Sequence, residues 1–332
     1  MKKVLFRVDA APGIGAGHLM RSIALAQYLV SQGVEIHFLT FQPWDSLKVY
    51  LTSQNFQVEY LALTQDELGG EKDLETLLGK LAQGFDWVVL DNYHFGSDYE
   101  KRVKAADANL LVIDDEGGRV FSCDIVLNHG LQATQLNYHR GVAQTLLGTD
   151  YALIRRELID AKKNKKKGSS NILVTLGGSG DEEILKKIAE AIQSLGSSEI
   201  KVKVLSGFSD SSAPPEFDLS EIYDWADLAI CAGGGTSWEL CFYGITGIVG
   251  ILAKNQERVA RSLDEKKIFK SIGWFRDISS EELVSQIKSL IHNQRKLAEM
   301  RERASQLVDG KGPERIYQAM QEVESESYQS RR

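Results

Sequence analysis

The chain has 332 residues, enough for two domains of ordinary size, each with its own apolar core. A hydrophobic share of 43% and a charged share of 26% are typical of a globular protein. The formal net charge of −7 argues against a nucleic-acid partner, since phosphate binding needs clustered Lys and Arg. The one basic run, residues 162–167, is interpreted as a solvated linker.

Three scattered cysteines, Cys123, Cys231 and Cys241, lack the spacing of a metal site, and their odd number argues against disulfides. They favour a reducing compartment and predict no metal site. The first apolar segment is too short for a signal peptide, and no apolar run has bilayer-spanning length. We therefore expect a cytoplasmic protein without an integral membrane segment, present as a monomer or a weak dimer.

Short β-branched apolar runs alternate with amphipathic helical segments along the chain. The runs are nearly continuous, which is typical of strands buried on both faces of a parallel sheet. The predicted strands are Val4–Val8, Val34–Thr40, Trp87–Leu90, Leu110–Ile113, Ile125–Leu127, Ile172–Leu176, Val202–Leu205, Leu228–Cys231 and Ile248–Leu252. Helices are predicted over Leu19–Val30 and Glu182–Leu195, among others. The alternation occurs twice and predicts an α/β protein with two Rossmann-like domains.

A change in composition near residues 160–170 predicts the domain boundary. We expect an N-terminal Rossmann-like domain over residues 1–160, which carries the catalytic histidine loop. A C-terminal Rossmann-like, nucleotide-binding domain is expected over residues 168–310, and a C-terminal helix with a frayed tail over residues 311–332. In open parallel sheets ligands bind beyond the carboxyl ends of the strands, so the residues that follow each strand are the candidates for function.

The first predicted strand ends in a glycine-rich loop that contains Gly13, Gly15 and Gly17. Such a loop lets the backbone approach a ligand closely. A dinucleotide site is disfavoured because the third glycine comes too early and the second strand ends at Thr40 without an Asp or Glu for a ribose. No cofactor is therefore expected.

His18 follows these glycines on the first turn of the predicted helix, and Arg21 lies one turn further on. The positive end of the helix dipole disfavours an imidazolium there, and a neutral imidazole is what a general base needs. A histidine that only caps or packs the helix is the alternative. The glycines and Arg21 favour the functional interpretation.

Carboxylates follow two other strands of this domain: Asp91 after the third strand, and Asp114-Asp115-Glu116 after the fourth. One of them is expected to orient His18, and others to hold sugar hydroxyls. An Asp at a strand end is also a common helix cap or turn former, and that alternative stays open.

Two further glycine loops follow strands of the C-terminal half. Residues 177–181 read Gly-Gly-Ser-Gly-Asp, and residues 233–239 read Gly-Gly-Gly-Thr-Ser-Trp-Glu. We expect both loops to hold a diphosphate, with Glu239 on the ribose hydroxyls. A tight turn is the alternative for the first loop, and a capping box formed by Thr236 and Glu239 is the alternative for the second. Neither loop continues into Gly-Lys-Ser/Thr, so neither is a Walker loop.

Several motifs occur in an order that resembles one known family. They are Ile14-Gly15-x-Gly17-His18-x-x-Arg21, Asp114-Asp115-Glu116, Cys123-Asp124-Ile125-x-Leu127-Asn128, Tyr151-Ala152-Leu153-Ile154-Arg155 and Asn255-Gln256-Glu257. Over about residues 4 to 260 the chain resembles the UDP-sugar hydrolases of pseudaminic acid synthesis and the spore-coat polysaccharide proteins grouped with them. This family belongs to the GT-B architecture, in which two parallel sheets face one another across a cleft.

The resemblance implies metal-independent hydrolysis of a UDP-2,4-diacetamido-2,4,6-trideoxy-β-L-altrose type of substrate, with UDP and the free sugar as products. The family's catalytic histidine corresponds to His18, and its loop asparagine corresponds to Asn255. The expected catalytic residues are His18 and Asp91. The expected substrate-binding residues are Gly15, Gly17, Arg21, Asp114, Asp115, Tyr151, Arg155, Asn255 and Gln256. The expected nucleotide-binding residues are Gly177, Gly178, Gly234, Gly235, Thr236, Ser237 and Glu239.

Two alternatives remain open at this point. A glycosyltransferase similar to MurG places a sugar acceptor where the hydrolase places water, and a non-catalytic protein binds the sugar nucleotide without turnover. The segment Asn128-His129-Gly130 is expected to form a wall on the substrate side and does not match the family closely. It bears on the identity of the sugar more than on the chemistry.

Overall fold

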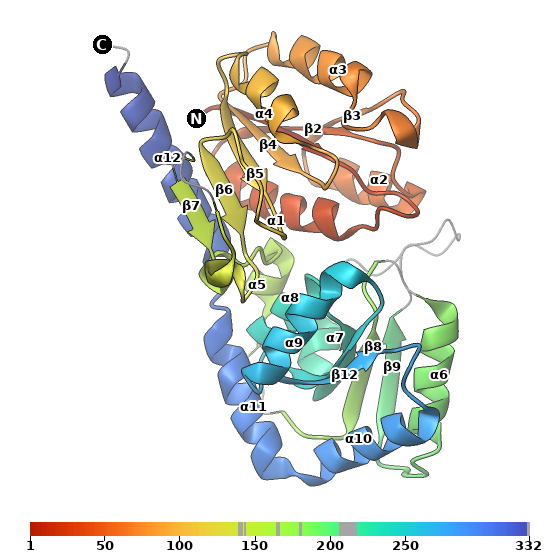
Figure 1. The fold of residues 1–332 in the computed structure, drawn as a ribbon. Helices are drawn as coiled ribbons and strands as arrows, with labels where there is room; N and C mark the ends of the chain where they lie inside the picture. Colours follow the sequence, from red (N-terminus) through yellow and green to blue (C-terminus); the bar gives the residue numbers. More distant parts are fainter. Residues whose placement is uncertain (139–141, 143, 164–166, 179–180, 206–217, 331–332) are drawn as a thin grey trace. The chain divides into compact units, whose positions relative to one another are not determined.

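A computed structural model describes residues 1–138, 142, 144–163, 167–178, 181–205 and 218–330. The chain divides into two compact units, one of residues 1–156 with 311–332 and the other of residues 157–310. Each unit contains one parallel sheet with helices packed on it (Figure 1). The predicted class, α/β with two Rossmann-like domains, is confirmed. Residues 164–166 of the basic run and 179–180 of the first C-terminal glycine loop lie outside the described residues.

The first unit is built on a seven-stranded sheet in the order β3-β2-β1-β4-β5-β6-β7. Its strands are β1 Lys3–Val8, β2 Glu35–Thr40, β3 Gln57–Tyr60, β4 Trp87–Asp91, β5 Asn109–Ile113, β6 Ile125–Asn128 and β7 Gln144–Leu147. The chain runs outward from β1 to β3 and then returns to the other side of β1 with β4. The switch point therefore lies between β1 and β4, where Val8 pairs with Asp91. A ligand of such a sheet binds beyond the carboxyl ends at the switch point.

Helices of the first unit cover both faces of this sheet. They are α1 Gly17–Ser31, α2 Asp45–Ser53, α3 Glu71–Leu81, α4 Ser97–Lys104 and α12 Gly312–Ser330, and α5 Arg156–Ala161 links the two units in sequence. Apolar side chains of α3 and α4, such as Leu77 and Val103, share a core with Leu5 and Val88 of the strands. Helix α1 packs on β1, β2 and β4, and α12 packs on α1.

The polar C-terminal tail from Glu322, which the sequence predicts to be frayed, is part of α12 as far as Ser330. Side-chain contacts explain this continuation. Glu324 accepts hydrogen bonds from the amino group of Met1, at 2.7 Å, and from Nε1 of Trp87, at 3.0 Å, and Val323 is buried.

The second unit has a five-stranded sheet in the order β12-β11-β10-β8-β9. Its strands are β8 Asn171–Thr175, β9 Lys201–Leu205, β10 Leu228–Ala232, β11 Thr246–Ile251 and β12 Phe269–Trp274. Its helices are α6 Glu182–Gln193, α7 Ser220–Trp225, α8 Thr236–Phe242, α9 Glu257–Glu265, α10 Ser280–His292 and α11 Gln294–Leu307. The switch point lies between β8 and β10, so the loops after these two strands are neighbours.

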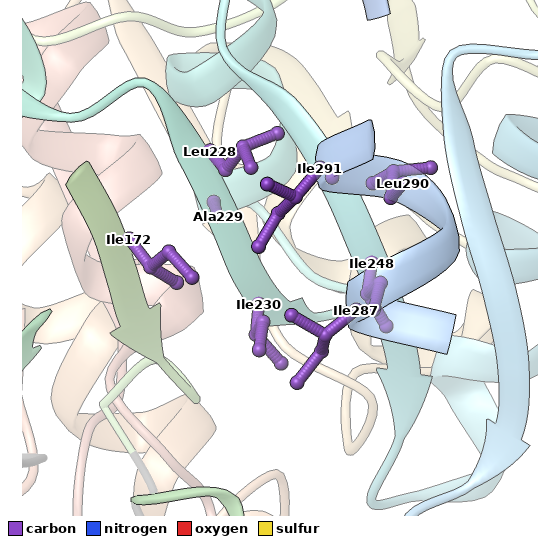
Figure 2. Close-up of a pocket in the computed structure, with 9 residues that line it drawn as sticks. Ile172, Leu228, Ala229, Ile230, Ile248, Ile287, Leu290 and Ile291 are labelled. Carbon is purple, nitrogen blue, oxygen red and sulfur yellow. The ribbon is translucent and has the colours of Figure 1, made fainter. Parts of the chain in front are cut away.

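A small apolar gap of about 10 Å³ lies between this sheet and α10 (Figure 2). Strand residues such as Leu228 and Ile230 face Ile287 and Ile291 of the helix across it. The gap is lined by aliphatic side chains and is at the lower limit for one water molecule. It is a packing defect of the core and has no polar group with which to orient a ligand.

All the strands that the sequence pattern missed lie at sheet edges. The predictions for the central strands are confirmed to within two residues, as is the edge strand β9. The strands β3, β7 and β12 were not predicted, and each lies at an edge. Their sequences, such as Gln-Val-Glu-Tyr in β3, are partly exposed and lack a continuous apolar run.

Gly69, which precedes α3, provides a test of the packing beneath the switch point of the first unit. Its φ is +73°, and a Cβ at this position meets the carbonyl oxygen of His94 at 2.4 Å. We expect Gly69→Ala to lower the free energy of unfolding by about 2 kcal/mol or more, since backbone strain and steric overlap add. The matched control is Gly79→Ala in α3, where a Cβ meets nothing within 4 Å, and it is expected to stabilise by about 0.5–1 kcal/mol. Urea unfolding measures both, and equal effects would contradict the packing described.

Candidate functional site

The glycine loop between β1 and α1 owes its shape to two of its glycines. Gly13 and Gly15 both have φ of +86°, a conformation that L-residues rarely adopt. The N–H groups of Ile14 and Gly15 donate to the carbonyl of Ala11, at 3.0 and 2.9 Å. This tight turn brings the chain directly from the end of β1 into α1, which begins at Gly17. His18 consequently stands on the first turn of α1.

The imidazole of His18 is bound to the carboxylate of Asp91. Nδ1 of His18 lies 2.7 Å from Oδ1 of Asp91, and the two residues come from α1 and from the end of β4. Asp91 is fully buried and His18 is 8% exposed. An ionised carboxylate accepts a proton donor, so we assign the proton to Nδ1, which leaves the lone pair on Nε2. The two predicted catalytic residues, His18 and Asp91, are thus in direct contact.

Arg21 joins Asp91 to a second carboxylate. Its Nε and Nη2 lie 2.8 and 2.6 Å from the two oxygens of Asp91, and its Nη1 lies 2.6 Å from Oδ1 of Asp115. Ser22 Oγ also donates to Asp91, at 3.1 Å. Tyr93 donates from its hydroxyl to Oδ2 of Asp115, at 3.0 Å, and its ring packs edge-on against that of His18 with centroids 4.8 Å apart.

Charge keeps both carboxylates of this cluster ionised. Burial alone raises the pKa of Asp91, but the positive charge of Arg21 and the contact with His18 outweigh it, and the pKa lies below its ordinary value. The same balance of burial against Arg21 holds the pKa of Asp115 far below its ordinary value. The cluster of His18, Arg21, Asp91 and Asp115 therefore contains two negative charges and one fixed positive charge.

His129, which follows β6, lies close to this cluster. It is buried, and burial followed by the charge of Arg21 lowers its pKa to about 4, so it is neutral near pH 7. The N–H of Leu153 donates to its Nδ1 at 3.3 Å. This contact ties His129 to the segment Tyr151–Ile154, which precedes the buried Arg155. The predicted substrate-binding residues Tyr151 and Arg155 therefore lie on either side of Leu153, whose N–H binds His129 of the predicted substrate-side wall.

Asp114 is used differently from its neighbour Asp115. Its Oδ2 accepts hydrogen bonds from the N–H groups of Glu116 and Gly117, at 3.0 and 2.6 Å, and from the hydroxyl of Tyr138, at 2.9 Å. Tyr138 also accepts from Nδ2 of Asn128 at 2.6 Å. These contacts give Asp114 the geometry of a turn former.

A second buried cluster supports the start of the glycine loop. The guanidinium of Arg7 is fully buried and binds Asp73 through Nε and Nη2, at 2.8 and 2.6 Å, and Asp9 through Nη1, at 2.5 Å. Asp9 accepts from the N–H of Phe41 at 2.6 Å and lies 3.0 Å from Nε2 of His94. Burial raises the pKa of Asp9, but His94 and Arg7 outweigh it, and the net shift is downward. Asp9, the residue that follows β1, is therefore anchored by charge.

In the second unit the two glycine loops meet at the switch point. A Cβ on Gly177 would come within 3.9 Å of Oγ1 of Thr236. Asp181 is the N-cap of α6 and accepts from the N–H of Ile184 at 3.1 Å. The capping-box explanation of Thr236 and Glu239 is wrong, since α8 begins at Thr236 and Gly235 is its N-cap.

Glu239 has another partner: the hydroxyl of the fully buried Tyr223 donates to its Oε2 at 2.9 Å. Ser237 is also fully buried, and its Oγ donates to the carbonyl of Ala232 at 3.3 Å. Gln256 accepts from the N–H of Leu252 at 2.8 Å through Oε1, which shapes the short 3₁₀ turn Lys254–Gln256. Asn255 in that turn is exposed.

Packing explains only one of the three consecutive glycines at 233–235. A Cβ on Gly233 would lie 2.9 Å from the carbonyl oxygen of Gln256, so the fold requires glycine there. A Cβ on Gly234 or Gly235 meets nothing within 4 Å, and neither has a positive φ. Gly177 in the other loop has a φ of +78°, which favours glycine there. Packing and backbone conformation therefore do not require glycine at 234 or 235.

Across the described ranges of the chain, no group of three or more His, Cys, Asp or Glu side chains is arranged to hold a metal ion. Among the same residues, no helix has the length and apolarity to cross a bilayer.

Comparison with known proteins defines the class of this fold. The chain is similar to the crystal structure of MurG from Acinetobacter baumannii, with a TM-score of 0.65 and 17% identity over 97% of this chain and 100% of that one. The two units are thus the Rossmann-like domains of a GT-B protein. Residues 148–316, about half of the chain, match the model of the glycosyltransferase family 28 C-terminal domain, and the chain belongs to that family.

Two relatives confirm the resemblance drawn from the motifs. The chain is 26% identical over 229 residues to the UDP-2,4-diacetamido-2,4,6-trideoxy-β-L-altropyranose hydrolase of Campylobacter jejuni, a match that covers 68% of this chain and 75% of that protein. It is 22% identical over 334 aligned positions to the spore coat polysaccharide biosynthesis protein SpsG of Bacillus subtilis, which covers 93% and 95% of the two chains.

The buried cluster of Arg7, Asp9 and Asp73 leads to a prediction on stability. In Arg7→Met two fully buried carboxylates lose their cation, and we expect the free energy of unfolding to fall by about 3–5 kcal/mol. Arg102→Met is the matched control, because Arg102 pairs with Glu71 on the surface, and its loss is expected to stay below about 1 kcal/mol. Urea unfolding at pH 7 measures both. A loss below 1 kcal/mol in Arg7→Met would show that the carboxylates do not depend on this cation.

Proposed function

We propose that the chain hydrolyses a UDP-activated sugar at its anomeric carbon and releases UDP and the free sugar. The observation that carries the proposal is the contact of His18 with the buried, ionised Asp91 at the switch point of the first sheet. A histidine whose Nδ1–H is held by a carboxylate is oriented and is stabilised as it gains a proton at Nε2. The names of the hydrolase from C. jejuni and of SpsG support a sugar nucleotide as the substrate.

In the proposed reaction, a water molecule attacks the anomeric carbon while the bond from that carbon to the diphosphate oxygen breaks. Nε2 of His18 takes the proton of the attacking water, and Asp91 stabilises the resulting imidazolium. The electron pair of the broken bond leaves with the diphosphate of UDP. A single displacement of this kind inverts the configuration at the anomeric carbon. The proposed reaction needs no strong general acid, because UDP is already a good leaving group, and the glycine loops of the second unit take the place of a metal in stabilising the charge that grows on the diphosphate.

We assign the UDP moiety to the loops at the switch point of the second unit. Gly177, Gly178, Gly234, Gly235, Thr236 and Ser237 belong to the diphosphate subsite of this proposal, and Glu239 binds the ribose hydroxyls. Two observations support the assignment. The fold does not require Gly234 and Gly235 to lack side chains, and the hydroxyl of Tyr223 holds Oε2 of Glu239 in place.

We assign the sugar to residues of the first unit around His18, with Gly15, Gly17, Asp115, Tyr151 and Arg155 as its proposed contacts. Asn255 and Gln256 are the proposed substrate-binding residues of the second unit. The relative from C. jejuni suggests a sugar of the 2,4-diacetamido-2,4,6-trideoxy-β-L-altrose type. Tyr93 is added to the proposed contacts of the first unit, because its half-exposed ring lies against His18. Asp114, by contrast, acts through the turn that it forms.

Glycosyl transfer is the second candidate, and the family match together with the likeness to MurG favours it. The same histidine then deprotonates an acceptor hydroxyl in place of water. Incubation of the protein with UDP-sugars and EDTA, without an acceptor, distinguishes the two. Release of UDP and free sugar, followed by NMR, supports hydrolysis. Release only after an acceptor is added supports transfer, and UDP binding without turnover of any UDP-sugar supports a non-catalytic protein.

His18→Asn tests the base. The amide cannot take a proton, so we expect kcat to fall by about 10²–10⁴-fold while the Kd for UDP changes less than about twofold. Isothermal titration with UDP and the NMR assay measure the two quantities. His37→Asn is the matched control, since His37 pairs with Glu35 near the start of β2, and it is expected to keep the parent kcat. A His18→Asn protein that retains activity would refute the proposed base.

Gly234→Ala tests the nucleotide subsite. A Cβ there meets no protein atom within 4 Å, so the melting temperature is expected to stay within about 2 °C of the parent value. The methyl group would occupy space assigned to the diphosphate, and we expect the Kd for UDP to rise at least about tenfold. Gly79→Ala in α3 serves again as the control and leaves the Kd unchanged. An unaltered Kd in Gly234→Ala would place UDP elsewhere.

A further inference from the structure

Arg21 was expected to bind substrate, and its contacts indicate a different role. Its Nε and Nη2 grip both oxygens of Asp91, and its Nη1 binds Oδ1 of Asp115. All three guanidinium nitrogens are thus within 2.8 Å of a carboxylate oxygen, and 11% of the side chain is exposed. A substrate ligand would have to compete for the same donors with two ionised partners, of which Asp91 is fully buried.

We propose that Arg21 is a positioning residue, which acts on His18 through Asp91 and sets the charge around the base. The proposal rests on the assigned roles of His18 and Asp91 in the proposed function. Helical spacing supports it: His18, Arg21 and Ser22 stand at positions i, i+3 and i+4 of α1, and all three contact Asp91. Arg21 therefore fixes the rotation of the carboxylate that receives Nδ1–H of His18.

The same contacts determine the balance of charge. The titratable groups that face His18 are Arg21 on its own helix, Asp91 at the end of β4, Tyr93 after β4, Asp115 after β5 and His129 after β6. The groups around His18 carry one net negative charge, from Asp91 and Asp115 against Arg21. Without Arg21 they carry two, and both favour a protonated His18. A protonated His18 cannot accept a proton from water, so loss of Arg21 moves the active pH range upward.

Lysine does not reproduce this arrangement. The planar fork of arginine reaches both oxygens of Asp91 and one of Asp115 at once, whereas an ammonium is a single point charge on a flexible chain. Arg21→Lys therefore preserves the charge balance and loses the orientation of Asp91. Arg21→Met loses both. The double variant Arg21→Met/Asp115→Asn restores one net negative charge and still lacks the fork.

The experiment follows the titration of His18 by NMR in protein with isotope-labelled histidine, where the signal is assigned by its absence in His18→Asn. We expect the midpoint to rise by about one pH unit or more in Arg21→Met, and to return toward the parent value in Arg21→Met/Asp115→Asn. Arg21→Lys is expected to titrate near the parent value. Arg102→Met is the control for removal of a surface arginine and leaves the midpoint unchanged. This readout needs no substrate, so it stands even where the protein hydrolyses no UDP-sugar.

Kinetics complete the test in protein that turns over a UDP-sugar. We expect Arg21→Met to lower kcat by about 10²-fold with KM changed less than about threefold, and the acidic limb of the pH profile to move upward. Arg21→Lys is expected to lower kcat by about tenfold with the limb in place. If Arg21→Met fails to fold, the double variant Arg21→Met/Asp115→Asn is compared with the parent and with Asp115→Asn instead. A raised KM with unchanged kcat would show that Arg21 is a substrate ligand, and an unmoved His18 midpoint would show that Arg21 does not set the charge around the base. Either result overturns the proposal.

Discussion

One buried carboxylate organises the candidate site of the first unit. Asp91 ends β4, next to β1 at the switch point, and three side chains of α1 bind its two oxygens. Because these side chains are spaced as neighbours on one helical face, a single carboxylate fixes both the rotation of α1 and the direction of the imidazole. Asp91 stays ionised in a fully buried position only because Arg21 and His18 compensate the cost of burial. The position of the base and its charge state thus depend on the same contacts.

The loop that carries His18 is held in a similar way at its other end. Asp9 is buried and ionised because Arg7 and His94 face it, and Arg7 is in turn shared with Asp73. In each cluster one arginine lies between two carboxylates. Leaving a fully buried carboxylate such as Asp9, Asp73 or Asp91 unpaired costs several kcal/mol, so alternative loop positions that separate these groups are strongly disfavoured. The two positive-φ glycines make the turn possible, and the two clusters select its position.

The sequence pattern predicted the central strands, because strands buried on both faces need continuous apolar runs. It missed β3, β7 and β12, where one side of the strand has no partner and polar residues are tolerated. The strand-end rule predicted that Asp91 and the carboxylates at 114–116 would lie at the same edge of the sheet as His18, and that one of them would orient it. It did not separate Asp115, which faces Arg21, from Asp114, which forms a turn, because adjacent residues point in different directions that spacing alone does not specify. Tyr93 and His129 follow β4 and β6 and were accessible to the same rule, whereas the contact of Tyr223 with Glu239 joins two helices and leaves no local pattern.

The glycines of these loops fall into two groups, according to whether backbone conformation or packing requires glycine. Gly13, Gly15 and Gly177 have positive φ, and Gly233 lies against the backbone of Gln256, so the fold accounts for each of them. Gly17, Gly234 and Gly235 have neither property, and a side chain at any of them would extend into open space. All three stand where a strand of a switch point passes into a helix, in the first unit beside His18 and in the second above Thr236. Selection for folding stability alone would favour residues with a smaller entropic cost than glycine at these positions. In the proposed function, a ligand that approaches the backbone closely is the reason for glycine at these three positions.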